Sequence, residues 1–261
     1  MRFVTFNLRC DYQQDGANCF CYRQPMILRV IEREKPDILC FQEVLPHMER
    51  WLKEHLSEYY LIGCGRGEDL DGEQGTIAFR KERYQLLAMS TFWLSETPTL
   101  PGSRYPDQSI CPRTCTDAVL MDENSGFIFR VMNTHLDHEG EKARELGIRQ
   151  ILRQADTERF FSDAPLILAG DFNAAPDSME MKPLLEHAGL TILTRDIGVT
   201  YHGYGCAEHP SQIDYIVLRG PLYCTGIRKW TDEENGVYLS DHYPVCAEIR
   251  WRMGNGKPGR S

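Results

Sequence analysis

No apolar stretch of this 261-residue chain approaches the roughly 18 residues that a membrane-spanning helix needs. Met1 and Arg2 lead directly into a strand-like segment, so we expect no signal peptide in the sequence as given. Among the ten cysteines, no CxxC pair has a matching partner, which argues against a structural zinc site. Residues such as Cys40 and Cys246 lie inside apolar runs, as small buried side chains do. These features predict a cytoplasmic protein with reduced thiols.

The chain also lacks an excess of positive charge. Its formal net charge is −9, and no basic run or arginine-rich tail is present. Non-specific binding to a nucleic-acid duplex depends on lysine and arginine side chains that neutralise phosphates. A local basic face is still compatible with this composition, so nucleic acid is a substrate that has to be argued for separately.

The length and composition predict a globular α/β protein. With 42% hydrophobic and 26% charged residues, the chain is typical of soluble domains, and at this size it can bury roughly three quarters of its unfolded surface. We expect one domain over residues 1–252. Residues 253–261 are polar and rich in glycine, so we predict a disordered tail there.

Hydrophobic periodicity predicts an alternation of strands with a few helices. Helices are expected over 22–34, 46–56, 140–160 and 178–188, and a long loop over 95–114, which is rich in Pro, Ser and Gly. Strands are expected near 3–7, 38–42, 59–63, 75–80, 84–92, 115–121, 127–134, 165–170, 213–218, 223–230 and 244–250. This mixture predicts a layered, sheet-based α/β domain. No internal repeat is visible in the sequence.

The most informative segment is Leu166-Ile-Leu-Ala-Gly-Asp171-Phe-Asn173, an apolar run that ends in a carboxylate and a carboxamide. Residues i and i+2 of an extended chain face the same side, so Asp171 and Asn173 are expected to point into one site. A carboxylate in that position can act as a general base toward a water molecule. The alternative is a simple Asx turn.

Four further segments repeat this design of an apolar run that ends in polar residues. They end in Asn7, in Glu43, in the stretch Asn133-Thr-His135-Leu-Asp-His138, and in the pair of segments that carry Asp214 and Asp241-His242. From the residues alone, Glu43 is equally a hard oxygen ligand for Mg²⁺ or an acid in the first turn of the next helix. Asn7 could hold Glu43 or simply form a turn.

These blocks, in this order from residue 3 to residue 247, resemble the endonuclease/exonuclease/phosphatase superfamily, whose fold is deoxyribonuclease I-like. The block Phe92-Trp-Leu-Ser-Glu-Thr-Pro98 is most similar to a bacterial branch of that superfamily. The resemblance implies a four-layer α/β/β/α sandwich of two mixed sheets flanked by helices. It also implies a hydrolase that requires Mg²⁺, with Mn²⁺ as the alternative cation.

The resemblance assigns roles to the histidines and to the aspartates near them. His242 matches the family's essential acid/base or phosphate-contacting group, and Asp214 matches its partner, which agrees with neighbours such as Asp241 and His242 pointing to opposite faces of an extended segment. Asp241 matches a residue near the metal, with Glu43 and Asn7 as the metal ligands. His135 matches a second histidine that stabilises charge on the phosphate.

Three further residues are candidates for contact with substrate phosphate. Arg113 could clamp a phosphate with its planar guanidinium, and His138 and His202 could lie at the rim of the site. The alternatives are a surface salt bridge for Arg113, a loop or helix cap for His138 and a glycine-rich turn around His202. A zinc site of His135, Asp137 and His138 fails on spacing, because odd and even positions of a strand diverge.

Together these observations predict a Mg²⁺-dependent phosphoesterase in which an activated water attacks the phosphorus in line. The substrate would be a phosphodiester or phosphomonoester, as a small molecule or as nucleic acid. One alternative is a nuclease that acts on DNA or RNA, and another is a non-catalytic binding module on the same scaffold. We expect a monomer with no obligate protein partner and no membrane association.

Overall fold

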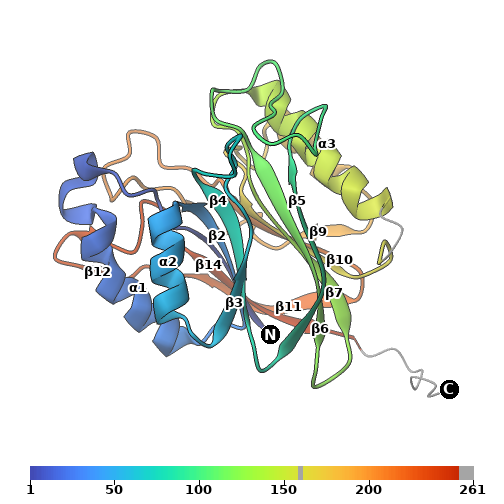
Figure 1. The fold of residues 1–261 in the computed structure, drawn as a ribbon, viewed down its shortest axis with the longest axis horizontal. Helices are drawn as coiled ribbons and strands as arrows, with labels where there is room; N and C mark the ends of the chain where they lie inside the picture. The colour runs from blue at the N-terminus through green and yellow to red at the C-terminus, as the bar shows by residue number, and fades with distance from the viewer. Residues whose placement is uncertain (158–160, 253–261) are drawn as a thin grey trace.

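Within residues 1–157 and 161–252, which the computed structural model describes, the strands form two six-stranded mixed sheets and one two-stranded ribbon. The two large sheets face each other and carry helices on their outer faces (Figure 1). The predicted four-layer sandwich is therefore confirmed. The first sheet contains, in spatial order, β11 (Leu222–Lys229), β14 (Val245–Trp251), β1 (Arg2–Asn7), β2 (Ile38–Val44), β4 (Gln74–Arg80) and β3 (Tyr59–Ile62).

The second sheet has the same internal plan as the first. Its spatial order is β5 (Tyr84–Trp93), β6 (Thr114–Asp122), β7 (Ile128–His135), β8 (Leu166–Asp171), β10 (Asp214–Arg219) and β9 (Leu190–Ile192). Among the described strands, each sheet has one parallel pair, β1–β2 or β7–β8, followed by two antiparallel neighbours. The fold therefore repeats in its two halves, although no repeat is visible in the sequence. The ribbon consists of β12 (Glu233–Glu234) and β13 (Val237–Tyr238).

The helices make the crossovers that parallel pairing requires. The first half uses α1 (Phe20–Glu34) between β1 and β2, and the second uses α3 (Glu141–Thr157) between β7 and β8. As predicted, α1 ends at Glu34, because Lys35 adopts a left-handed conformation and its N–H caps the carbonyl of Ile31. The other helical segments are η1 (Gln13–Asn18), α2 (Pro46–His55), η2 (Met179–Met181) and α4 (Lys182–Leu185).

The central strands are buried on both faces, which explains why they are continuous apolar runs. In β1, Phe3 belongs to the core between the sheets, whereas Val4 belongs to the core beneath α1 and α2. In β2, Ile38 and Leu39 divide in the same way. The alternation of side chains along a strand therefore supplies two cores from one segment.

The structure differs from the sequence predictions in two respects. The helix expected over 178–188 is broken into η2 and α4 and ends at Leu185, since Pro183 fits only the first turn of a helix. The short strands β9, β12 and β13 were not predicted. Residues 158–160 of the helix expected over 140–160, and the tail expected over 253–261, lie outside the described residues. The single domain over residues 1–252 stays a prediction. None of the described helices is both long and apolar enough for a membrane span.

Candidate active site

Most of the predicted site residues gather at one edge of the sandwich, around a cleft of about 590 Å³. This edge is where the carboxyl ends of β1, β2, β7 and β8 meet, so each parallel pair delivers its last side chains to the same place. The cleft is lined by Glu43, His135, Asp171, Asn173, Asp241 and His242, and also by Arg9, Arg66, Glu73 and Arg113.

Strand register sets three of these residues in a row across the second sheet. His135 ends β7 and pairs with Asp171, which ends β8. Asp171 in turn pairs with Asp214, the first residue of the antiparallel strand β10. Neighbouring strands are about 4.8 Å apart, so the three side chains are immediate neighbours.

Asp171 is the centre of this arrangement. Its Oδ2 accepts a hydrogen bond from Asn7 Nδ2 at 3.0 Å and lies 3.6 Å from His135 Nε2 and 3.7 Å from His242 Nε2. Its Oδ1 accepts the backbone N–H of Asn173 at 2.9 Å. Burial, together with the charge of Asp214, raises the pKa of Asp171 to about 7. The carboxyl group therefore titrates in the neutral range, which suits a general base.

Asn173 occupies a left-handed backbone conformation directly after the strand, with φ of 49°. Asparagine tolerates this conformation better than most residues. Its side-chain Nδ2 donates to the carbonyl of Leu136 at 3.0 Å, which fixes the amide beside Asp171. Asp171 and Asn173 both line the cleft, as predicted, but the chain between them is not extended: the Asn173 N–H bonds to Asp171 Oδ1 in an Asx turn, which was the alternative interpretation.

His242 pairs with Asp214, as the sequence predicted, and not with its neighbour Asp241. His242 Nδ1 lies 2.8 Å from Asp214 Oδ2, and both side chains are buried. Burial alone would lower the pKa of His242, but the charge and hydrogen bond of Asp214 outweigh it and raise the pKa to about 10. At neutral pH the ring is therefore an imidazolium.

Asp241 points to a different set of groups from His242. It accepts a hydrogen bond from Ser240 Oγ at 3.1 Å, and Arg9 Nε lies 3.6 Å from its Oδ2. Burial raises the pKa of Asp241, and the negative charge of Glu43 adds to that effect. The two carboxylates are thus close enough to repel each other.

Glu43 is held at an irregular position of β2. The register with β4 shifts between Phe41 and Val44, and Glu43 has a φ of 61°, which is uncommon for a residue with a side chain. Such strain is typical of functional positions. Glu43 Oε1 accepts from Asn7 Nδ2 at 3.0 Å and Oε2 from the Cys10 N–H at 2.8 Å. Burial opposes ionisation, but these bonds outweigh it and lower the pKa of Glu43.

Glu43, Asp241 and Asn7 fit a hard divalent cation. Mg²⁺ prefers oxygen ligands, with one or two carboxylates and the remaining positions left to water and phosphate. The two mutually repelling carboxylates supply that ligand chemistry, and a cation between them would relieve their repulsion. The group of Asp171, Asp214 and His242 is less suited, because Asp214 already holds the His242 ring.

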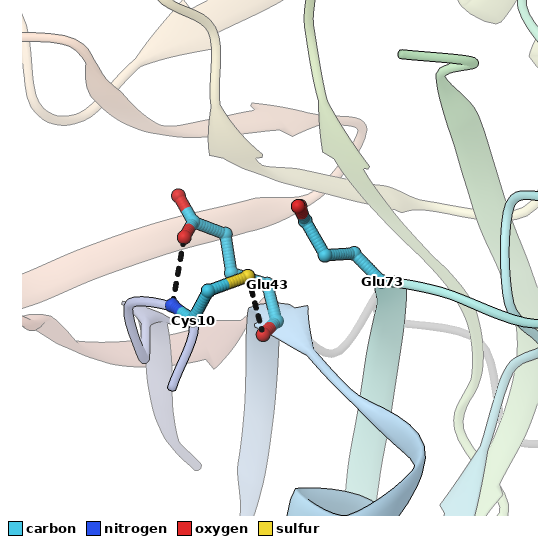
Figure 2. A group of neighbouring side chains, drawn as sticks. All are labelled: Cys10, Glu43 and Glu73. Carbon is cyan, nitrogen blue, oxygen red and sulfur yellow. Dashed lines mark hydrogen bonds between the residues drawn. The ribbon is translucent and has the colours of Figure 1, made fainter. Parts of the chain in front are cut away.

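A second acid, Glu73, lies beside Glu43 at the start of β4 and was not predicted from the sequence. Figure 2 shows the Glu43 and Glu73 side chains extending in the same direction, with Cys10 next to Glu43. Burial raises the pKa of the Cys10 thiol, so it stays protonated and is a poor metal ligand. Glu73 forms an ion pair with Arg66 at 2.7 Å. Since β4 is antiparallel to β2, the predicted strand over 75–80 could have placed Glu73 at this edge.

The three phosphate candidates lie in different surroundings. Arg113 and His138 both line the cleft. The His202 ring is buried, stacks on Tyr243 at 3.9 Å between centroids, and packs against the segment that carries Asp241 instead of lining the cleft. That position gives no support to phosphate contact by His202. Tyr201, which was not predicted, lines the cleft and lies 5.1 Å from the His242 ring.

Comparisons with known proteins agree with this fold. The model of the endonuclease/exonuclease/phosphatase family matches residues 4–242. An uncharacterised protein of Acanthamoeba polyphaga mimivirus is 29% identical over 250 residues, which cover 85% of this chain and 89% of that protein. A crystal structure of an endonuclease/exonuclease/phosphatase from Bacteroides vulgatus has a TM-score of 0.90 and 30% identity, covering 96% of this chain and 98% of that one.

A mannosyl-6-phosphatase from Bacteroides thetaiotaomicron VPI-5482 is also similar. It has a TM-score of 0.84 and 26% identity, and the match covers 96% of this chain and all of the other, at 100%. The similarity therefore extends over the whole sandwich and over the edge that carries the cleft.

Proposed function

The chain belongs to the endonuclease/exonuclease/phosphatase family, and on that premise we propose that it hydrolyses a phosphate ester with the help of a divalent cation, Mg²⁺ or Mn²⁺. Members of this family are hydrolases that act on phosphoester bonds. The cation and the choice of ester are our proposal for this chain.

The main support for this proposal is the surroundings of the Asp171 carboxylate. A single atom, Asp171 Oδ2, lies within hydrogen-bonding or near-contact distance of Asn7, His135 and His242 at the floor of one cleft. A non-catalytic module that had lost turnover would be expected to lack part of this set. Asn7, His135 and His242 instead all surround Asp171 Oδ2, which supports an enzyme.

In the proposed mechanism, Asp171 accepts a proton from the attacking water. Its Oδ1 accepts the Asn173 N–H, and its Oδ2 accepts from Asn7 and lies 3.6 Å from His135 Nε2 and 3.7 Å from His242 Nε2, so we assign the proton transfer to Oδ2. The Asn173 amide, fixed on the carbonyl of Leu136, has a second N–H available for a phosphoryl oxygen. Positioning of water and phosphate in this way accounts for much of the rate enhancement in phosphoryl transfer.

The histidines would stabilise the charge that develops on the phosphoryl group. His242, kept as an imidazolium by Asp214, can donate from Nε2 and can protonate the leaving oxygen. His135 has its pKa lowered by burial and by nearby arginines, so it acts as a neutral donor. Glu43, Asn7 and Asp241 would hold the cation, which when bound supplies Lewis-acid stabilisation of phosphoryl oxygens.

A small phosphate ester is the substrate class that we favour. The relative from Bacteroides thetaiotaomicron is named as a mannosyl-6-phosphatase and is 26% identical. The net charge of −9 argues against tight duplex binding.

The test is hydrolysis of p-nitrophenyl phosphate and bis(p-nitrophenyl) phosphate with Mg²⁺, Mn²⁺ or chelator, followed by a screen of sugar phosphates, nucleotides, phosphoinositides, RNA and DNA. His242→Ala should lose activity, and His187→Ala, on a distant surface next to Asp156, should retain it. Activity that ignores chelator, or an active preparation of His242→Ala with an unchanged rate, contradicts the proposal.

A further inference from the structure

Arg113 is a buried cation with an unused hydrogen-bond donor. The residue is 4% exposed and lines the cleft. Its Nη2 donates to His138 Nδ1 at 2.8 Å, but its Nη1 is buried and has no hydrogen-bond partner among residues 1–157 and 161–252. Buried polar groups are nearly always bonded, so an orphaned guanidinium nitrogen at the wall of a cleft points to a ligand.

Asp137 forms a long ion pair with Arg113 but leaves Nη1 without a partner in the described part of the chain. Its Oδ2 lies 3.5 Å from Arg113 Nε, which is at the limit of a hydrogen bond. The same carboxylate already accepts the Ser109 hydroxyl at 2.5 Å and the Gly140 N–H at 2.8 Å. The shorter bonds of Asp137 therefore go to the Ser109 and Gly140 loops, and its contact with Arg113 is the weakest of the three.

His138 extends the donor surface beside Arg113. Arginine can only donate, so His138 Nδ1 accepts from Arg113 and the ring proton is on Nε2. The His138 side chain is 49% exposed and lines the cleft. Its Nε2 lies 3.4 Å from Glu139 Oε1, and both side chains are exposed, so a phosphate oxygen at the open side of the cleft would compete with Glu139 for this N–H.

Arg66 places a second guanidinium in this wall. Trp93 Nε1 donates to the Arg66 carbonyl at 2.7 Å and fixes its backbone, and Arg66 Nη2 pairs with Glu73 at 2.7 Å. Arg66 and Arg113 line both the cleft and a narrower hollow beside Glu43 and His135. The two guanidinium groups repel each other, and an anion between them would remove that repulsion.

Strand register shows where Arg113 lies relative to His135 and Asp171. Cys115 of β6 pairs with Thr134 of β7. Arg113, just before β6, therefore lies beside the residues that follow β7, one strand beyond His135 on the side away from Asp171. With a strand spacing of about 4.8 Å, a phosphoryl group held at His135 has Arg113 as its next neighbour.

We propose that Arg113, with Arg66 and His138, forms a subsite for a terminal phosphate group, so that the substrate is a phosphomonoester. This inference rests on the proposed hydrolytic function and narrows its substrate class. A phosphomonoester presents three acceptor oxygens and a charge of about −1.5 to −2 at pH 7. A diester has one fewer free oxygen and a single charge, and its second organic group cannot accept a hydrogen bond from the unpartnered Nη1 as a third phosphoryl oxygen can.

The first experiment compares kcat/KM for p-nitrophenyl phosphate and for bis(p-nitrophenyl) phosphate in wild type and Arg113→Gln. Loss of one preorganised donor to the phosphoryl group should lower the monoester value by about 100-fold. The diester value should change by less than about threefold on the same reasoning. Arg104→Gln, an exposed arginine of the same loop that donates to the Ser109 carbonyl, is the matched control and should leave both values unchanged.

The second experiment measures inorganic phosphate binding by calorimetry in chelator, without any ester. Wild type and Arg104→Gln should bind with equal affinity, and Arg113→Gln should bind at least about tenfold more weakly. A wild type that binds phosphate through Arg113 but hydrolyses neither ester would overturn the proposed function and leave the subsite standing. An active enzyme in which Arg113→Gln weakens both esters equally, or neither, overturns the subsite.

Because Arg113 is buried, its replacement could prevent folding. Arg66→Gln is the second variant, since the Arg66 side chain is 13% exposed and its loss leaves Arg113 in place. It should lower the monoester value by about tenfold and spare the diester. An unchanged ratio between the two esters in this folded variant counts against the subsite.

Discussion

Asn7 and Asp171 lie in different sheets, yet Asn7 Nδ2 donates to Asp171 Oδ2 at 3.0 Å. The same nitrogen donates to Glu43 Oε1, also at 3.0 Å. One carboxamide therefore joins the proposed metal ligand of the first sheet to the proposed base of the second. The two halves of the sandwich have the same strand plan, and Asn7 connects them at the cleft edge, as Gln42 does through Asn133.

This connection predicts the effect of Asn7→Ala. Without the amide, Glu43 and Asp171 lose a shared donor and are free to move apart, so kcat should fall by about 100-fold while KM changes little. Steady-state kinetics on p-nitrophenyl phosphate measures the loss. Asn124→Ala, in the exposed turn between β6 and β7, is the control and should keep wild-type kinetics. A rate within threefold of wild type for Asn7→Ala would remove Asn7 from the mechanism.

The activity should depend on pH as a bell-shaped curve. Asp171, with a pKa of about 7, must lose its proton to act as a base, so kcat/KM should rise as the pH increases through about 7. His242, with a pKa of about 10, must keep its proton to act as an acid, so the rate should fall above that value. A flat profile from pH 5 to pH 10, recorded at fixed ionic strength, is incompatible with these roles.

Asp214→Asn should lower the pKa of His242. The carboxylate is what keeps the buried ring protonated, and the uncharged amide cannot replace that charge. Imidazole resonances followed by NMR in the presence of chelator report the titration directly. The alkaline limb of the pH–rate profile should move to lower pH in parallel. If the His242 titration does not move, the pairing with Asp214 is not what sets its charge.

The ionised Asp137 should stabilise the fold, so the free energy of unfolding should fall in acid. Burial opposes its ionisation, but hydrogen bonds from Gly140 and Ser109 hold its pKa at about 2. The folded value lies below the unfolded value of about 3.9, so the contribution is complete above about pH 4 and disappears as the pH falls toward 2. It amounts to about 2 kcal/mol. Denaturant unfolding of wild type and Asp137→Asn should differ by this amount at pH 6 and converge near pH 2.

Arg23 should be important for stability. It is completely buried and donates to the backbone carbonyls of Leu8, Arg9, Asn18 and Leu239, which belong to separate segments around the cleft. Arg23→Met would leave these acceptors without donors and should lower the free energy of unfolding by about 3 kcal/mol. Arg29→Met, an exposed arginine of the same helix paired with Glu234, should cost less than about 1 kcal/mol. Equal losses in the two variants contradict this account.

Much of the site could be predicted from the sequence because its residues end apolar runs. Buried strands end at Asn7, His135 and Asp171 and one residue after Glu43, and parallel pairing brings such positions to one edge. Asp214 could be chosen over Asp241 as the partner of His242, because adjacent residues of an extended segment point apart.

The other residues of the cleft and the remaining details of the fold depend on tertiary contacts, which leave no local pattern in the sequence. Arg66 and Glu73 come from a glycine-containing loop with no strand or helix pattern. Their place in the cleft is evident only once the fold brings them beside Arg113. His202 stands in a turn-like stretch that could equally face solvent, and its stacking on Tyr243 is decided by the fold. The break between η2 and α4 follows from Pro183 but competes with a helical apolar pattern.

Hydrolysis should require a divalent cation held by Glu43. The most direct test is the rate of p-nitrophenyl phosphate hydrolysis as a function of Mg²⁺ concentration for wild type and Glu43→Gln, combined with calorimetric titration of the metal. We predict that chelator abolishes the wild-type rate, that Mg²⁺ restores it, and that Glu43→Gln binds the metal at least about tenfold more weakly with a lower maximal rate. A Glu43→Gln variant with wild-type metal affinity and wild-type rate would contradict the claim.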